Sequence, residues 1–227
     1  MTYKFDFSFL RETWPDFLAG ALLTLSLSAA AIVLGFVLGT ACAVARTQGN
    51  RVARTIVTGY VEIIRNTPLL VQTFWLFFGL ASIGFRLSAF QAAILALTIN
   101  VGAYTSEIVR AGIESIHKGQ IEAGESLGLS RWSQLRDIIL PPAIERVMPA
   151  LSSQFILIML ASSIMAQISA EELMAAASRV QSDTFRGFEI YLVVAGIYVA
   201  LSLLMRGVFE LIARIAFPRR RHLGTPI

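Results

Sequence analysis

Charged side chains are scarce in this sequence, and this scarcity argues against a soluble globular protein. Asp, Glu, Lys and Arg make up 15% of the 227 residues, against about 25% in soluble domains, while 56% are apolar. A soluble surface needs more charge than this chain carries. The charges are also clustered, and they leave five uncharged stretches: between Asp16 and Arg46, Arg65 and Arg86, Arg86 and Glu107, Arg146 and Glu171, and Glu189 and Arg206.

Lysine, cysteine and histidine are rarer still, and each absence excludes a kind of site. The two lysines are followed by Phe5 and Gly119, so neither fits the Gly-Lys-Ser/Thr end of an ATP-binding P-loop. Cys42 is the single cysteine, so an internal disulfide is excluded. His117 and His222 stand alone without metal-ligand spacing. We therefore predict no metal site, and no set of catalytic residues stands out.

Each uncharged stretch is interpreted as a membrane-spanning helix. Crossing the hydrocarbon layer takes about 20 apolar residues in a helix; the first four stretches reach that length, and the fifth stays apolar past Arg206 to Phe217. A single stretch of this kind also fits a buried helix of a soluble protein, but five in one chain favour the membrane. We predict an all-α integral membrane fold of five transmembrane helices in one domain, residues 1–227, with spans near 18–45, 67–85, 87–109, 148–168 and 188–216.

Lysine and arginine set the predicted orientation, because cytoplasmic loops carry an excess of both. Five spans place the two termini on opposite sides. With the N-terminus outside, 14 of the 19 basic residues lie inside, the Arg219–Arg221 run included, and five lie outside: Lys4, Arg11, Arg86, Arg179 and Arg186. The excess of basic over acidic residues then reflects this topology and attraction to anionic lipid, and it does not indicate binding to nucleic acid.

The longest polar segment carries signals of two short helices, over 122–127 and 131–139. Gly128 suits the left-handed residue that commonly closes a helix, and Ser130 is a favourable N-cap for the next one. Pro141 and its neighbour Pro142 are expected to stop the second helix, since proline lacks the backbone N–H. Upstream, the tripeptide Asn66-Thr67-Pro68 indicates the start of another helix.

The same segment, within residues 110–147, resembles the EAA loop of binding-protein-dependent ABC importer permeases. That pattern reads E-A-A, three residues, G, nine residues, I, one residue, L-P. It is matched over twenty residues, with glycine in place of the second alanine, at Glu122, Ala123, Gly124, Gly128, Ile138, Leu140 and Pro141. The resemblance implies that these residues couple the chain to an ATPase.

More of the chain resembles one branch of that family, the permeases for polar amino acids. The resemblance covers about residues 18–217, and it is carried by the stretches 61–72, 103–113, 118–123 and 184–192. One departure is visible: many members have a lysine just before the Ser-Ser or Thr-Ser of the fourth helix, where this chain has Leu160-Ala161 before Ser162-Ser163. Which amino acid is carried stays open.

The resemblance implies a set of partners. A cytoplasmic ATPase subunit would bind ATP and Mg, so this chain itself would hold no cofactor and would not be an enzyme. Leu127, Leu129 and Trp132 would anchor the loop in that ATPase, with Glu122 and either Arg131 or Arg136 at the rim. A second permease chain, identical or paralogous, and a periplasmic amino-acid-binding protein would complete the importer in the bacterial inner membrane.

Polar residues inside the membrane are costly and mark candidate functional sites. Asn100, Tyr104 and Glu107 recur on one face of the third predicted helix. By resemblance, Asn100 and Tyr104 would contact the amino acid, opposite Ser162 and Ser163, with the pocket closed by Leu69 and Gln72. The alternative is a polar stripe that only joins helices. Glu107 with Arg110 favours a structural ion pair.

A rival function is a stand-alone secondary transporter or channel for small polar solutes. Such proteins are commonly built from inverted repeats, and five spans do not divide into two equal halves. The sequence therefore favours the importer subunit.

Overall fold

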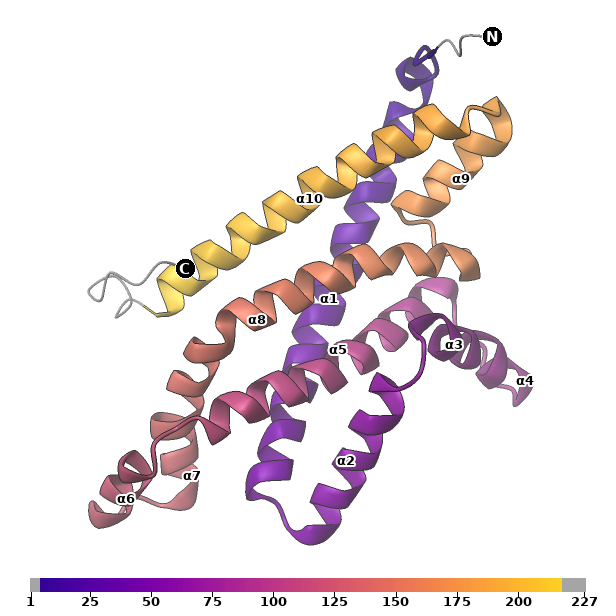
Figure 1. Ribbon diagram of the computed structural model, residues 1–227. Coiled ribbons are helices and arrows are strands. Elements are labelled where there is room, and N and C mark those ends of the chain that lie inside the picture. The colour runs from indigo at the N-terminus through magenta and orange to yellow at the C-terminus, as the bar shows by residue number, and fades with distance from the viewer. Residues whose placement is uncertain (1–4, 218–227) are drawn as a thin grey trace. The chain divides into compact units, whose positions relative to one another are not determined.

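The computed structural model describes residues 5–217, and these residues are almost entirely helical (Figure 1). Lys4, the Arg219–Arg221 run and His222, which entered the sequence argument, lie outside the described residues. In chain order the helical elements are α1 Leu10–Gln48, α2 Arg51–Arg65, α3 Leu69–Phe74, η1 Trp75–Gly79, α4 Leu80–Ser82, α5 Ala89–Glu114, α6 Lys118–Ser126, α7 Arg131–Ser133, η2 Gln134–Ile139, α8 Leu140–Ala161, η3 Ser162–Ile168, α9 Leu173–Thr184 and α10 Gly187–Ala216.

Within residues 5–217, four helical segments are long and apolar enough to cross a membrane. They are α1, α5, the continuous run Arg131–Ile168 and α10, and they correspond to four of the five predicted spans. The second predicted span, 67–85, is shorter than expected: it is the apolar segment Leu69–Ser82, made of stretches of six, five and three residues. All five apolar segments are helical, in agreement with the predicted fold class.

The predicted stop at Pro141 and Pro142 is wrong, because the helix continues through both prolines. The six residues before Leu140 form a π-helical turn, η2, and the Leu140 N–H donates to the carbonyl of Leu135. A π turn holds more residues than an α turn, which moves the preceding carbonyls away from the proline rings. The clash that would otherwise end the helix is thereby avoided.

The chain divides into two compact units. The first unit comprises Met1–Val33, Thr67–Thr98 and Ile156–Arg206, and the second comprises Leu34–Asn66, Ile99–Phe155 and Gly207–Ile227. The two units therefore share the long helices: α1, α5, α8 and α10 each have one part in the first unit and one part in the second.

A buried carboxylate joins three elements of the first unit. Glu172 is fully buried and caps the start of α9, where it accepts a hydrogen bond from the Ala175 N–H at 2.9 Å. It also accepts from the hydroxyls of Thr24 on α1 (3.3 Å) and Tyr198 on α10 (2.9 Å). Burial raises the pKa of this carboxyl, although the bonds that it accepts act in the opposite direction. Glu172 thus fixes α9 between α1 and α10.

Small residues let the helices of the second unit approach closely. A Cβ atom on Gly39 of α1 would lie 2.5 Å from the Thr105 Cβ of α5, and one on Gly102 would lie 2.7 Å from the Tyr60 hydroxyl of α2. That hydroxyl donates to the carbonyl of Ile99 at 2.6 Å. Such contacts between small residues are typical of helices packed inside membranes.

We expect Glu172→Ala to lower the free energy of unfolding by about 2–4 kcal/mol, because it leaves the buried Thr24 hydroxyl, the half-buried Tyr198 hydroxyl and the capped N–H of α9 without their acceptor. Thermal denaturation of the detergent-solubilised chain measures the loss. Glu171→Ala is the matched control, since the exposed Glu171 forms a surface pair with Arg179 at 3.4 Å. Equal melting temperatures for the two variants would contradict the structural role of Glu172.

Candidate functional site

The predicted coupling segment forms two helices joined by a tight turn, in the second unit (Figure 1). Helix α6 ends in a paired set of bonds: the Leu129 N–H donates to the Gly124 carbonyl at 3.1 Å and the Gly128 N–H to the Glu125 carbonyl at 2.9 Å. Gly128 has a φ of +72°, a left-handed value that only glycine adopts cheaply. The predicted role of Gly128 as the closing residue is confirmed.

The second helix of the segment begins as predicted, with one residue that the sequence reasoning missed. The Ser130 hydroxyl caps α7 by accepting from the Ser133 N–H at 3.2 Å. The buried amide of Gln134 donates to the Leu129 carbonyl at 3.0 Å and so ties the turn to η2. In the sequence, Gln134 is one polar residue among the apolar residues of this helix. That pattern does not by itself indicate a hydrogen bond that closes the turn.

Gly124 and Ile138, fourteen residues apart in the motif, are neighbours in space. Gly124 is buried, and a Cβ atom there would lie 2.7 Å from Ile138 Cδ1 and 3.4 Å from Gln134 Cγ. The glycine therefore lets α6 lie directly against η2. Of the other motif positions, Glu122 and Ala123 are exposed on α6, Leu140 is half-buried and Pro141 is exposed.

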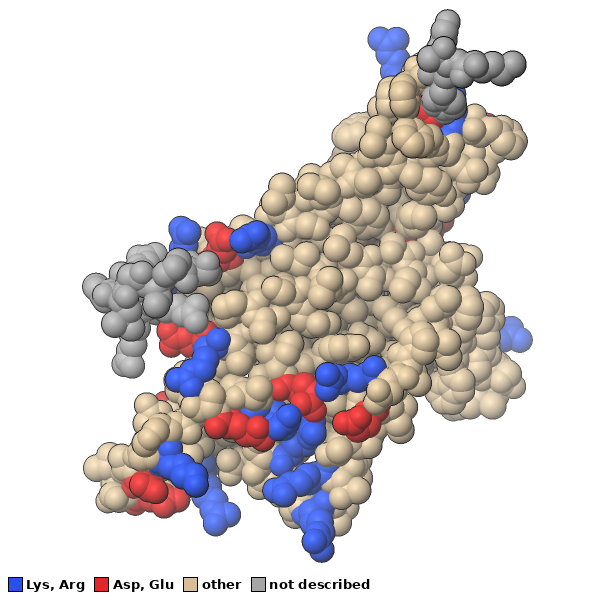
Figure 2. Space-filling view, viewed as in Figure 1, with Lys and Arg blue, Asp and Glu red and all other residues tan. Residues whose placement is uncertain are grey.

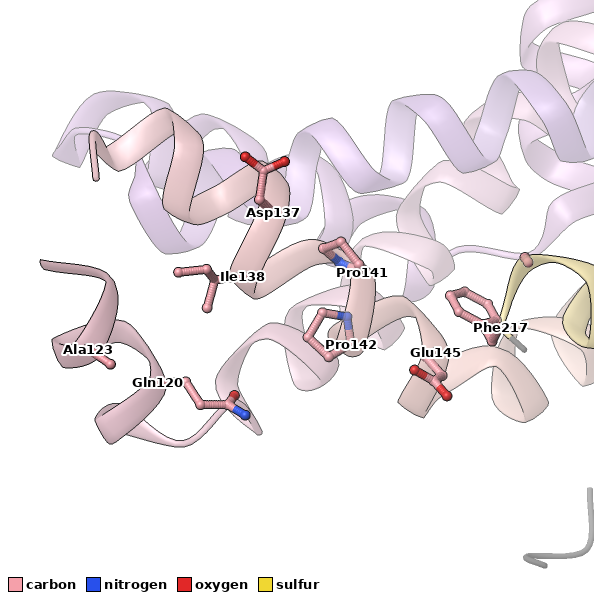
Figure 3. Close-up of a pocket in the computed structure, with 9 residues that line it drawn as sticks. Gln120, Ala123, Asp137, Ile138, Pro141, Pro142, Glu145 and Phe217 are labelled. Atoms are coloured by element: carbon pink, nitrogen blue, oxygen red, sulfur yellow. The ribbon is translucent and has the colours of Figure 1, made fainter. Parts of the chain in front are cut away.

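A cavity of about 610 Å³ separates α6 from the start of α8 and the end of α10 (Figure 3). The motif residues Ala123, Ile138 and Pro141 contribute to its wall. Figure 3 shows Gln120 and Ala123 on one side and the η2–α8 residues on the other. The complete lining is Gln120, Ala123, Asp137, Ile138, Pro141, Pro142, Glu145, Ala216 and Phe217.

Large apolar side chains are exposed on the turn of the coupling segment. Leu127 is 78% exposed and Trp132 66%, and Leu129 is also exposed. Exposed apolar clusters rimmed by charge mark surfaces that bind other proteins. Glu122, Arg131 and Arg136 are exposed beside them. The side chains that were predicted to anchor a partner are therefore accessible to one.

One carboxylate gathers the basic residues where α1, α2 and α5 meet. Glu107 forms ion pairs with Arg46 of α1, Arg110 of its own helix (2.8 Å) and Arg65 of α2 (3.9 Å). The predicted pair with Arg110 is confirmed, and the arginines of α1 and α2 are additions that only the fold reveals. Arg65 also lies over the ring of Tyr104, 5.4 Å from its centroid, a favourable cation–π distance.

The predicted substrate residues fall in two groups, one in each unit. Asn100 is buried and Tyr104 half-buried, one turn apart on α5 in the second unit. The other four lie in the first unit on two segments that touch, since Thr73 of α3 donates to the Met165 sulfur of η3 at 3.8 Å: they are Leu69 and Gln72 on α3 and Ser162 and Ser163 on η3.

Three of these side chains also have local hydrogen bonds. The Gln72 amide donates to the carbonyl and hydroxyl oxygens of Thr67 at 3.0 and 2.9 Å. The Ser162 hydroxyl donates to the Met159 carbonyl at 2.7 Å, and the Ser163 hydroxyl to the Leu160 carbonyl at 2.8 Å. The serine oxygens keep their lone pairs as acceptors. Substrate contact by all six residues stays a prediction.

The family described as binding-protein-dependent transport system inner membrane component matches residues 31–216. The glutamine transport system permease protein GlnP of Escherichia coli (strain K12) is 36% identical over 213 residues, 93% of this chain and 97% of its own length. The probable glutamine ABC transporter permease protein GlnM of Bacillus subtilis (strain 168) is 41% identical over 196 residues, 86% of this chain and 91% of its own.

A solved structure shares the fold. The crystal structure of an amino acid ABC transporter with histidines matches with a TM-score of 0.84 and 35% sequence identity, over 93% of this chain and 99% of that one. The agreement extends over nearly the whole of both chains.

Gly124→Ala should be tolerated and Gly124→Leu should not. Alanine favours a helix by about 0.5–1 kcal/mol over glycine, and the Ile138 methyl that it meets is the end of a flexible side chain. Leucine overfills the contact, at a cost of about 1–3 kcal/mol, and should push α6 away from η2. The rate of tryptic cleavage at Arg131 measures the change. Cleavage of the leucine variant at the unmodified rate would rule out this close packing.

Proposed function

The chain belongs to the family of binding-protein-dependent transport system inner membrane components, and we propose that it is the membrane-spanning subunit of an ATP-driven importer of polar amino acids. As a member of that family it is a multi-pass inner-membrane protein. The relatives named for glutamine support the substrate class. A stand-alone secondary transporter or channel is not favoured, since the relatives are permease proteins of transport systems.

The observation that carries the proposal is the geometry of the coupling segment. Two helices are closed by the Gly128 turn and held together at Gly124 and Ile138. The turn presents Leu127 and Trp132 to the surroundings. A rigid projection with exposed apolar tips is suited to a cleft on another protein, because apolar anchors in a pocket supply most of the binding energy of an interface.

The energy source in this proposal is a separate ATPase subunit that binds ATP and Mg. Glu122 with Arg131 or Arg136 makes the rim contacts, while Leu127, Leu129 and Trp132 fill the cleft. Closure of two such ATPases moves the two coupling segments of a permease pair, either two copies of this chain or this chain and a paralogue. The movement opens the substrate path alternately to the two sides of the membrane.

The periplasmic side of the proposal rests on the segment between η3 and α10. The N-terminus is placed in the periplasm and the C-terminus in the cytoplasm, from the distribution of lysine and arginine. Helix α9 then lies on the periplasmic side, with Glu172 holding it against α1 and α10. A periplasmic binding protein that delivers the amino acid meets a surface whose position this buried carboxylate keeps constant.

The proposed substrate contacts are chemically suited to an amino acid. Asn100 offers an amide donor and acceptor, and Tyr104 offers a phenol whose ring lies under the Arg65 guanidinium. An amide, a phenol and a nearby cation can bind the ammonium and carboxylate groups of a zwitterion. Ser162, Ser163, Leu69 and Gln72 complete the proposed contacts from the first unit.

Replacing the exposed anchors by charge should separate the chain from its ATPase. Leu127→Asp and Trp132→Asp each place a carboxylate where an apolar pocket is proposed, and we expect about a tenfold or greater loss of co-purified ATPase. Phe185→Asp is the matched control, because Phe185 is 86% exposed but lies at the end of α9. Undiminished ATPase recovery with both coupling variants would overturn the proposed docking.

Asn100→Ala should raise the amino acid concentration for half-maximal uptake about tenfold, since one hydrogen bond to the substrate is lost. Uptake into proteoliposomes that contain the complete importer measures the effect. Ser106→Ala is the control: Ser106 is buried on α5, and within residues 5–217 its hydroxyl has no hydrogen-bond partner. An equal effect of both variants, or none for Asn100→Ala, would remove Asn100 from the substrate site.

A further inference from the structure

A second cavity, distinct from the proposed coupling and substrate residues, lies in the second unit. It has a volume of about 390 Å³ and opens where the end of α1, the first half of α2 and the end of α5 meet. Its wall is rich in cations and hydroxyls. The lining residues are Arg46, Thr47, Arg54, Thr58, Arg110, Ile113 and Glu114.

The charges of this cavity do not cancel. Three arginines line it against one carboxylate, Glu114. Glu114 accepts from Arg110 at 2.7 Å, and Arg46 pairs with Glu107. These pairs leave Arg54 as the excess charge. Within residues 5–217 its guanidinium makes one hydrogen bond, from Nε to the Arg46 carbonyl at 3.1 Å, so the two terminal nitrogens keep their donors for a ligand.

The geometry of Arg54 and Thr58 suits an oxyanion. They lie one turn apart on the same face of α2, and both line the cavity. A guanidinium presents parallel N–H donors that match two oxygens of a phosphate, and a threonine hydroxyl adds a donor. Figure 2 shows basic and acidic side chains gathered over α2 and the neighbouring end of α5, with blue basic groups prominent along α2.

The opposite face of α2 is apolar and exposed. Val52 is 66% exposed, Ile56 65% and Ile63 65%, and their spacing puts them on one side of the helix. One helix thus offers cationic donors on one face and apolar surface on the other. That pattern is typical of a helix at a membrane surface, where phospholipid head groups are the abundant phosphate groups, and it therefore favours a lipid over a small soluble anion.

The place of the cavity along the spanning helices points to the same ligand. Helices α1 and α5 are long and apolar enough to cross the membrane, and they end at Gln48 and Glu114, beside the cavity. The predicted spans 18–45 and 87–109 end just before the lining residues Arg46 and Arg110, and this puts the cavity at the predicted edge of the hydrocarbon layer, near the lipid head groups. Basic pockets between membrane helices at this depth bind anionic head groups.

We propose that this cavity binds the phosphate group of an anionic membrane phospholipid, held mainly by Arg54 and Thr58. Arg46 and Arg110 add little net charge, because Glu107 and Glu114 already neutralise them. The proposal concerns a lipid site of the chain itself and does not depend on which solute the importer carries.

Native mass spectrometry of the full-length, detergent-solubilised chain tests the proposal. The probes are phosphatidylglycerol, the zwitterionic phosphatidylcholine and soluble glycerol 3-phosphate. The unmodified chain should retain phosphatidylglycerol in preference to phosphatidylcholine. Arg54→Gln should weaken that retention at least about fivefold, the effect expected for loss of one cation near an anionic head group.

Arg51→Gln is the matched control. It removes the same charge from the same helix, but Arg51 is exposed and does not line the cavity, so retention of phosphatidylglycerol should be unchanged. Arg54 is exposed as well, and equal melting temperatures of the two variants will verify that folding is intact.

Three results would overturn the proposal. Equal weakening by both variants would mean diffuse attraction to a basic surface, and equal retention of the two lipids would mean no recognition of an anionic head group. Binding of glycerol 3-phosphate that depends on Arg54, without any preference for phosphatidylglycerol, would identify a soluble phosphate as the ligand instead of a lipid. Unchanged amino acid uptake would not affect the lipid result, because the two sites are tested by separate readouts.

Discussion

A backbone inside hydrocarbon has no water to bond with, so nearly every N–H and C=O group must find its partner within the chain. This constraint explains why the described residues are helical and why each interruption has a local remedy. Where α2 ends, the Asn66 amide donates to the Glu62 carbonyl at 2.8 Å. Where α3 begins, the Gln72 amide donates to the Thr67 carbonyl. Before Pro141, the π turn shifts the bonding pattern instead of breaking the helix.

The same constraint concentrates charge at the ends of the helices. Glu107 is partly buried and faces three arginines from three helices. Its removal would leave those cations repelling one another in a poorly solvated place, a costly arrangement. The carboxylate therefore acts as the common partner that lets α1, α2 and α5 converge. This convergence brings Arg65 over Tyr104 and leaves Arg54 beside a cavity. The ion pairs of Glu107 therefore shape the surroundings of both the proposed substrate site and the proposed lipid site.

Small residues decide how close the helices come. Glycine at positions 39 and 102 lets α1, α2 and α5 touch, and a Cβ atom on Gly112 would lie 2.8 Å from the Ala143 carbonyl of α8. In a membrane such close packing replaces the hydrophobic effect as the force that joins helices. The coupling segment uses the same device at Gly124, against Ile138. The close contact holds α6 directly against η2.

The sequence by itself determined the fold class, because length and charge content are enough to recognise helices that cross a membrane. It also predicted the turn at Gly128, since the left-handed backbone there is a local property of glycine; coupling by the residues that resemble the EAA loop stays a prediction. The ion pair of Glu107 with Arg110 was also predictable from local spacing, because both residues lie on one helix, one turn apart.

Only the tertiary structure decided which distant residues meet. Nothing in the sequence around Glu172 marks it as special, yet it is buried between hydroxyls from α1 and α10 that lie 148 and 26 residues away. Arg46 and Arg65 became partners of Glu107 through helix convergence, and Gln134 became the bond that closes the coupling turn. The stop expected at Pro141 failed because bonding in the preceding turn shifted to a π pattern. The contacts of Glu172 and Glu107 depend on packing between elements, about which the spacing of residues along the chain carries no information. The Gln134 bond and the π turn are local, but residue types alone did not show how the backbone closes these turns.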